Sequence, residues 1–241
     1  MLDIRELKNE IASYWSGRVE KFCRLRRDEL NSDKRELWLA ELKRFLPQRR
    51  PLDVLDIGTG TGFFCFLLGA AGCRAIGIDI SQEMIAGARE TARELGAKAD
   101  FFVMDAEDPD FPPNSFDAIV TRNLTCFLPD LPRAYQAWHG LLREGGVLIN
   151  FDGDYNYDEE KRELPPHHSH EDVTAAQNEV YEQIRSDMKT VQKPRPDWDR
   201  QLLSKAGFSH ITVDNGVSSR VYREFDKFYN PVPLFAIVAR R

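Results

Sequence analysis

Three glycines at alternate positions follow a short apolar run in "VLDIGTGTGFF", residues 54–64. The run has the length and aliphatic content of a buried strand, and the apolar "FFCFLLGAAG" after the glycines is typical of a buried helix. Glycines between the two let the backbone turn sharply and approach a ligand closely, while the helix N-terminus offers unpaired N–H groups. The stretch therefore predicts a strand, a ligand-binding loop and a helix; a plain tight turn is the alternative.

The alternation of strand and helix continues after this unit. Further strands are expected at 74–79, 100–105, 116–121 and 145–151, with helices after Ser81 and at about 130–142. A helix near 197–206 and the strands "HITVDN" and "PLFAIVAR" complete the pattern. Such repeating units predict an α/β fold with a doubly wound, mostly parallel seven-stranded sheet of the Rossmann-like type. Ligands bind such a sheet beyond the carboxyl ends of its strands.

Two segments fall outside the alternation. Residues 1–48 have helical periodicity, and residues 152–195 are rich in Asp, Glu, His, Pro and Tyr, with one helix expected from about 171 to 189. The sequence therefore predicts an N-terminal helical cap (1–48), a ligand-binding core (49–151), an insertion (152–195) and a final part (196–241) that completes the core sheet. We expect the cap and the insertion to form a lid over the carboxyl edge of the sheet.

Charge and cysteine content limit the classes of partner and compartment. The formal net charge is 33 − 39 = −6, which argues against a nucleic-acid partner. The four cysteines are scattered, as is typical of a reducing compartment, and no apolar stretch approaches the roughly 20 residues needed to span a bilayer. These features predict a cytoplasmic protein without a membrane segment, and they leave open whether it is a monomer or a homodimer.

The spacing of the glycines separates two classes of cofactor. A dinucleotide-binding loop has the pattern G-x-G-x-x-G, but Phe63 stands where its third glycine would be, and the pattern here is G-x-G-x-G. Asp56 also precedes the glycines. A carboxylate at this place suits a ligand that carries an ammonium group and a sulfonium, and S-adenosylmethionine is such a ligand.

Four segments together carry a family resemblance. "VLDIGTGTG", "GIDIS", "VMDAEDPDFPPNSFDAIV" and "LLREGGVLINF" resemble, in order and spacing, the motifs of class I S-adenosylmethionine-dependent methyltransferases over residues 52–151. The segment "FPPNSFD" is similar to the ubiquinone- and menaquinone-biosynthesis type. The resemblance implies in-line transfer of a methyl group to a small-molecule acceptor, with S-adenosylhomocysteine as the product. A methyltransferase acting on a protein or another macromolecule, or a non-catalytic cofactor-binding regulatory module, is the alternative.

The resemblance also implies roles for residues of the cofactor site. Asp79 would hold the ribose hydroxyls, and Asp105 with Ala106 would face the adenine; a helix cap and a polar strand end are the respective alternatives. The residues expected to bind the cofactor are Tyr14, Arg18, Asp56, Gly58, Thr59, Gly60, Gly62, Asp79, Ile80, Met84, Asp105, Ala106 and Arg122.

The acceptor side is predicted from position alone. Methyl transfer needs an aligned acceptor and the exclusion of water, so no fixed catalytic motif is expected. The residues that follow strands 4 and 5 and lie in the insertion are the candidates: Arg122, Asn123, Asp152, Tyr155, Tyr157 and His167, with Tyr14, Trp15 and Arg18 contributed by the cap. Pairing of Arg122 with a loop acid is the alternative for that residue. Whether a general base takes part is left open.

The run "PPHHSH", residues 165–170, raises the question of a metal site. His167 and His170 are three residues apart, but no third ligand accompanies them in the sequence. Ser169, followed by acids at 171 and 172, also resembles the start of a helix. We therefore expect no metal site here; a helix entrance, or a polar or proton-accepting role for one histidine in the pocket, is expected instead.

Overall fold

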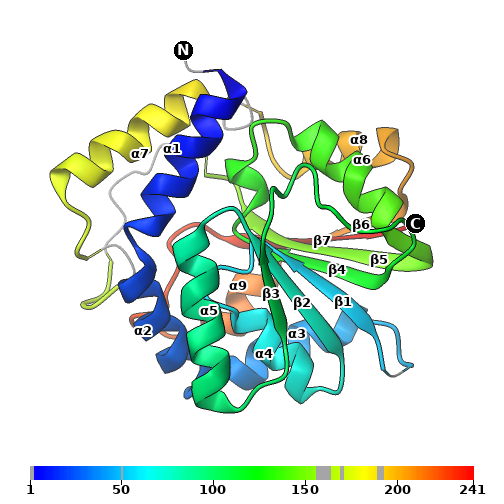
Figure 1. Cartoon of the computed structure of the whole chain (residues 1–241), viewed down its shortest axis with the longest axis horizontal. Coiled ribbons are helices and arrows are strands. Elements are labelled where there is room, and N and C mark those ends of the chain that lie inside the picture. The colour runs from blue at the N-terminus through cyan, green and yellow to red at the C-terminus, as the bar shows by residue number, and fades with distance from the viewer. Residues whose placement is uncertain (1–2, 50, 156–163, 169–170, 189–192) are drawn as a thin grey trace.

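The computed structural model describes residues 3–49, 51–155, 164–168, 171–188 and 193–241 of the chain (Figure 1). Its centre is a seven-stranded sheet in the order β3-β2-β1-β4-β5-β7-β6, in which only β7 runs antiparallel to its neighbours. The strands are β1 (Asp53–Ile57), β2 (Arg74–Asp79), β3 (Asp100–Val103), β4 (Phe116–Arg122), β5 (Leu142–Gly153), β6 (Ser209–Asp214) and β7 (Leu234–Arg240). The predicted doubly wound, seven-stranded fold is confirmed.

Helices cover both faces of the sheet (Figure 1). They are α1 (Ile4–Ser16), α2 (Val19–Leu30), α3 (Lys34–Phe45), α4 (Phe63–Ala70), α5 (Gln82–Leu95), α6 (Leu131–Leu141), α7 (Ala175–Asp187), α8 (Asp197–Lys205) and α9 (Val217–Val221), with a short 3-10 turn η1 (Thr125–Phe127). An apolar cluster on one face packs α3, α4, α5 and α9 against the strands, and a second cluster on the other face packs α6 and α8. Within the described residues, no helix has the length and apolar character to span a membrane.

The cap and the insertion meet through α1 and α7, which lie side by side (Figure 1). Leu7, Ile11 and Tyr14 of α1 form a small buried cluster with Ile184 of α7 and Met188 directly after it. This cluster is separate from the two clusters that flank the sheet. Two segments that are far apart in the sequence, the cap and the insertion, therefore share one apolar contact outside the sheet.

The insertion helix begins later than the sequence suggested. We expected it to begin at about residue 171, but α7 begins at Ala175, and Thr174 is its N-cap. The Thr174 hydroxyl accepts a hydrogen bond from the Gln177 N–H, and the Gln177 side chain accepts one from the Thr174 N–H. This reciprocal pair satisfies two backbone donors at the helix start, which the acids at 171 and 172 do not. The short α9 and η1 were also not predicted.

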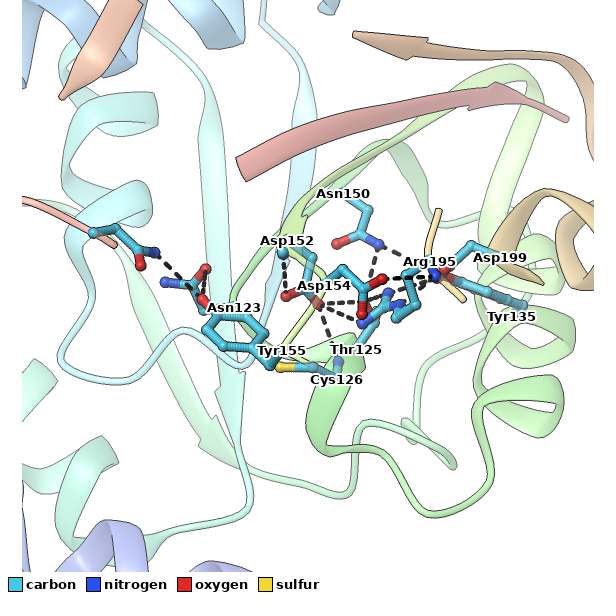
Figure 2. A network of polar contacts seen from close by, with 12 residues as sticks. Asn123, Thr125, Cys126, Tyr135, Asn150, Asp152, Asp154, Tyr155, Arg195 and Asp199 are labelled. Carbon is cyan, nitrogen blue, oxygen red and sulfur yellow. Dashed lines mark hydrogen bonds and ion pairs between the residues drawn. The ribbon is translucent and has the colours of Figure 1, made fainter. Parts of the chain in front are cut away.

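A buried polar network fixes the end of the insertion to the core (Figure 2). The Arg195 side chain, 2% exposed, donates to both carboxylate oxygens of Asp199 (2.5 and 2.8 Å) and to Asp152 (3.3 Å). Asp152 also accepts from the Thr125 hydroxyl (2.5 Å) and the Cys126 N–H (3.0 Å). One cation thus joins β5, η1 and α8, and its two carboxylate partners are as deeply buried as it is.

Replacing Arg195 with Met would leave the buried carboxyls of Asp152 and Asp199 without their shared counter-charge. We expect Arg195→Met to lower the free energy of unfolding by about 3–5 kcal/mol, as measured by urea denaturation. Arg200→Met is the matched control, because the Arg200 side chain is 54% exposed and pairs with Asp197 on the surface. That change should cost about 0.5 kcal/mol or less. Equal losses in the two variants would contradict a stabilising role for the network.

Candidate active site

The glycine loop between β1 and α4 lies at the carboxyl edge of the sheet. Gly58, Gly60 and Gly62 all have positive φ, of 68°, 54° and 91°, which explains why glycine is needed at each position. A Cβ on Gly58 would collide with the Leu124 side chain, whereas a Cβ on Gly60 would meet nothing within 4 Å. Gly60 therefore borders open space, and the loop leaves room there for another molecule.

Two acids hold the loop in place. The Asp56 carboxylate accepts from the Thr59 hydroxyl (2.6 Å), and Asp79, at the end of β2, accepts from the backbone N–H groups of Gly60 (3.0 Å) and Ser81 (2.9 Å). Ser81 itself caps α5, so Asp79 is not the helix cap. Asp79 thus connects the loop after β1 to the loop after β2.

The electrostatic state of the two acids differs from that of surface carboxyls. Burial raises the pKa of Asp56 to about 7, against the opposing effects of the Thr59 hydrogen bond and the Arg122 charge. Burial also raises the pKa of Asp79, although its hydrogen bonds from backbone N–H groups oppose the change. A cationic ligand beside these carboxyls would favour their ionised forms.

Asp105, after β3, contacts the N-terminal cap. Its carboxylate accepts from the Glu107 N–H (2.9 Å) and pairs with the Lys8 ammonium of α1 (2.7 Å). Lys8 also pairs with the buried Glu107. Side-chain ion pairs therefore hold α1 over the ends of the strands.

The end of β4 carries a buried ion pair. Arg122 donates from Nη1 and Nη2 to the two oxygens of Glu29 on α2, at 3.0 and 3.4 Å. Glu29 is fully buried and also accepts from the Trp38 indole N–H at 3.0 Å. Arg122 thus pairs with an acid, as the alternative expected, but that acid lies on a helix and not in a loop.

Asn123 is the next residue, and its backbone adopts a positive φ of 54°. Its N–H donates to the Phe151 carbonyl of β5 (2.8 Å), and its side-chain oxygen accepts from the Tyr155 hydroxyl at 3.2 Å (Figure 2). The Asn230 amide in turn donates to that hydroxyl (3.3 Å). The ends of β4 and β5 are thereby joined by side chains that face the same space.

These residues surround one cavity of about 560 Å³, within the range of about 300–1,000 Å³ that is usual for small-molecule sites. Its walls come from the loops after β1 to β4, from α1, α2 and α7, and from residues 222–232. The lining includes these expected residues: Tyr14, Trp15, Asp56, Gly58, Thr59, Gly60, Asp79, Ile80, Met84, Asp105, Ala106, Arg122, Asn123 and Tyr155.

Four expected site residues do not line the cavity: Gly62, Arg18, Asp152 and His167. Gly62 is the N-cap of α4, where its missing Cβ makes room for Phe66 and Phe101. Arg18 is buried against Tyr14 and Phe22. Asp152 is buried and pairs with Arg195. The prediction that it contacts the acceptor is therefore wrong, since it does not line the cavity.

His167 points outward as well. Its side chain is 81% exposed and contacts Glu171, while the next residue, His168, lines the cavity. A one-residue shift in a loop reverses which side chain faces inward, and no periodicity fixes that register. No cluster of three metal-ligating side chains occurs among the described residues. Tyr157 and His170 lie outside them.

Several cavity residues were not predicted from the sequence. Lys8, Arg26, Glu182, Tyr222 and Lys227 line the cavity and come from helices or from the segment before β7. Glu29 was missed too, although it anchors Arg122. The one available signal was its position: Glu29 is four residues after Leu25 and therefore lies on the same, buried face of α2.

Comparison with known proteins identifies the core. A family model described as "Methyltransferase domain" matches residues 55–150. This part of the chain is a class I, S-adenosylmethionine-dependent methyltransferase domain, as its motifs predicted.

Individual relatives support the same assignment. An aklanonic acid methyltransferase of Streptomyces sp. (strain C5) is 42% identical over 100 residues, 39% of this chain and 45% of that protein. Phosphoethanolamine N-methyltransferase 1 of Zea mays is 31% identical over 182 residues, 73% of this chain and 32% of that protein. The chain thus spans less than half the length of these curated relatives.

A solved structure shows the same fold. Phosphoethanolamine N-methyltransferase 2 of Haemonchus contortus, in complex with S-adenosyl-L-methionine, matches with a TM-score of 0.59 at 21% identity, over 84% of this chain and 51% of that one. S-adenosylmethionine is the methyl donor of this family. The open space beside Gly60 and the acids Asp56, Asp79 and Asp105 fit a ligand with an amino-acid cation and polar hydroxyl groups.

Filling the space beside Gly60 should block the cofactor. We expect Gly60→Ala to weaken binding of S-adenosylhomocysteine by at least about tenfold, as measured by calorimetry. Gly96→Ala is the matched control: Gly96 has a φ of 61°, a Cβ there also meets nothing within 4 Å, and it ends α5 away from the cavity. Both variants bear the same left-handed backbone cost of about 1–2 kcal/mol. Equal affinities in the two variants would contradict the assignment of the loop.

The raised pKa of Asp56, about 7, predicts pH-dependent binding. Below that pH the carboxyl of the free protein is mostly neutral, and an ammonium-bearing ligand lowers its pKa, so binding releases a proton. Affinity for S-adenosylhomocysteine should therefore rise by up to about tenfold per pH unit until about pH 7 and then level off. Calorimetric titration of Asp56→Asn should give a flat profile. The same slope in that variant would assign the titration to another group.

Proposed function

We propose that this protein transfers the methyl group of S-adenosylmethionine to a small-molecule acceptor. The observation that carries the proposal is the meeting of the glycine loop and three acids, Asp56, Asp79 and Asp105, with the ends of β4 and β5 in one cavity. Asp79 ends β2 and Asp105 follows β3, both on one side of β1 in the sheet order, whereas Arg122 and Asn123 lie at the end of β4 on the other side. A donor and an acceptor can therefore be held together.

The chain's own contribution is binding, orientation and exclusion of water. When bound, S-adenosylmethionine supplies a methyl group on a good sulfonium leaving group, so an aligned acceptor is the main requirement. Asp79 would accept hydrogen bonds from the ribose hydroxyls, and Asp56 would face the ammonium group. Arg122, Asn123 and Tyr155 would orient the acceptor. None of these residues needs to form a covalent bond.

The covering helices favour a small acceptor. Tyr14 of α1 contacts Tyr181 of α7 in a tilted arrangement, and Trp15 of α1 contacts Phe127 after β4 edge to face, each pair with ring centroids 5.5 Å apart. These ring contacts and the Lys8 ion pairs hold residues of α1 and α7 at the cavity, and they support the proposal that the two helices form a lid that excludes water. The names of the relatives, aklanonic acid and phosphoethanolamine methyltransferases, also point to small molecules. The cytoplasmic location, the absence of a nucleic-acid partner and the oligomeric state stay predictions.

Methyl transfer has to be measured directly, because a fold can host more than one chemistry. Incubation with S-adenosylmethionine and a fractionated metabolite extract should produce S-adenosylhomocysteine and an acceptor heavier by one methyl group, both detected by mass spectrometry. Tight cofactor binding without any transfer would favour the non-catalytic module. Transfer only to a protein fraction would favour the macromolecular alternative.

Asp79→Asn provides the specific test of the cofactor site. Hydrogen bonds to a charged group contribute about 1.5–3 kcal/mol, so we expect affinity for S-adenosylhomocysteine to fall about ten- to hundredfold. Asp100→Asn is the control, because Asp100 is an exposed acid at the start of β3, whereas Asp79 lies at the end of the neighbouring strand β2. Thermal melts of both variants separate a binding effect from unfolding, since Asp79 also holds the Gly60 N–H. Affinity within about twofold of the parent would show that another residue binds the ribose.

A further inference from the structure

One buried carboxylate serves two arginines at the cavity wall. Glu29 accepts from Arg122 at 3.0 Å, and it also pairs with Arg26, one turn earlier on α2. The Trp38 indole N–H adds a neutral donor to the same carboxylate. The cluster of Arg26, Glu29 and Arg122 therefore has two positive charges and one negative charge.

This excess charge sits in apolar surroundings. The Arg122 side chain is 8% exposed, and its guanidinium carbon lies 4.9, 4.6 and 5.0 Å from the ring centroids of Trp38, Phe63 and Phe64. Aromatic faces offset part of the cost of burying a cation, but they do not neutralise it. Burial and the neighbouring Arg122 charge lower the pKa of Arg26, whereas the charges of Glu29 and Asp56 raise the pKa of Arg122 against the effect of burial.

Nearby acids supply only part of the missing charge. Asp56 lines the same cavity and its charge acts on Arg122, but burial raises the pKa of Asp56 to about 7, so it is only partly ionised at neutral pH. Asp28 is paired with Lys227 at 2.6 Å. Glu182 pairs with Arg185 at 3.4 Å. The described part of the chain therefore leaves the Arg26 and Arg122 pair with a net positive charge.

Both arginines are accessible from the cavity. Arg26 and Arg122 line it, and the Arg26 side chain is 18% exposed. A guanidinium has five N–H donors in a planar fork, and Arg26 donates from its Nη1 to Glu29. Tyr222 lines the same wall, and burial raises the pKa of its hydroxyl to about 12, so it is a donor at neutral pH. This wall of the cavity therefore offers N–H and O–H donors and a positive charge.

We infer that Arg26 and Arg122 form a subsite for an anionic group, a carboxylate or a phosphate, carried by the methyl acceptor. This inference rests on the proposed function and specifies its substrate class. Guanidinium groups bind such planar or tetrahedral oxyanions through paired hydrogen bonds. The subsite is lined by α2, the end of β4 and residues 222–232, whereas the acids at the ends of β2 and β3 lie on the other side of β1 in the sheet order. The acceptor is thus a small molecule with a negative charge at one end.

The experiment uses inorganic phosphate and acetate as probes. Each is titrated at low ionic strength into the protein saturated with S-adenosylhomocysteine, and calorimetry records binding. We expect one anion per chain to bind in the parent and to bind at least tenfold more weakly in Arg26→Gln. Arg24→Gln, an exposed arginine on the same helix, is the control and should leave binding within twofold of the parent. Failure of both anions to bind the parent would overturn the inference.

A second arm separates the acceptor from the cofactor, whose own carboxylate is the rival source of the anion. Affinity for S-adenosylhomocysteine should be unchanged in Arg26→Gln, which retains the Glu29–Arg122 pair and should therefore fold, as a thermal melt would check. If that affinity falls tenfold while binding of methylthioadenosine, which lacks the amino-acid part, is unaffected, the arginines hold the cofactor and the inference is wrong. If the parent does not bind S-adenosylhomocysteine at all, the proposed function is refuted. Titration of the anions into the protein without S-adenosylhomocysteine would then still test the subsite.

Discussion

The hydrogen bond from the Gly60 N–H to the Asp79 carboxylate is the constraint on which the candidate site depends. It fixes the glycine turn after β1 to the end of β2, and the left-handed glycines then direct α4 back along the sheet. With this turn in place, Asp56, Asp79 and the open space beside Gly60 share one edge of the sheet. The remaining walls of the cavity are built around that edge.

Charge is divided unequally around the cavity. Asp79 ends β2 and Asp105 follows β3, both on one side of β1 in the sheet order, whereas Arg122 lies at the end of β4 on the other side and shares Glu29 with Arg26. Each side is suited to a ligand of opposite sign, and burial strengthens the contrast because a low dielectric screens charges poorly. The same burial raises the pKa of Asp56 to about 7, so at neutral pH this carboxyl is fully ionised only beside a cation.

Local patterns predicted the core of the site because they carry their own geometry. The glycine spacing, the acid before it and Asp79 at a strand end all follow from strand and turn chemistry, and the structure places them on one cavity. Asp152 and His167 could not be placed in this way. Asp152 depends on Arg195, which is 43 residues away, and His167 depends on the register of a loop. Position after a strand locates a residue near the site, but it does not fix where the side chain points.

The sequence by itself determined the order of strands and helices, the cofactor loop and the family of the core, because periodicity, turn residues and short motifs act over a few neighbouring residues. Only the tertiary structure decided which distant charges meet. Glu29 reaches Arg122 across 93 residues, and Lys8 reaches Asp105 across 97, through the way α1 and α2 lie over the sheet. Those helices are placed by apolar packing, which is non-directional, so their charged partners become visible only after the chain has folded.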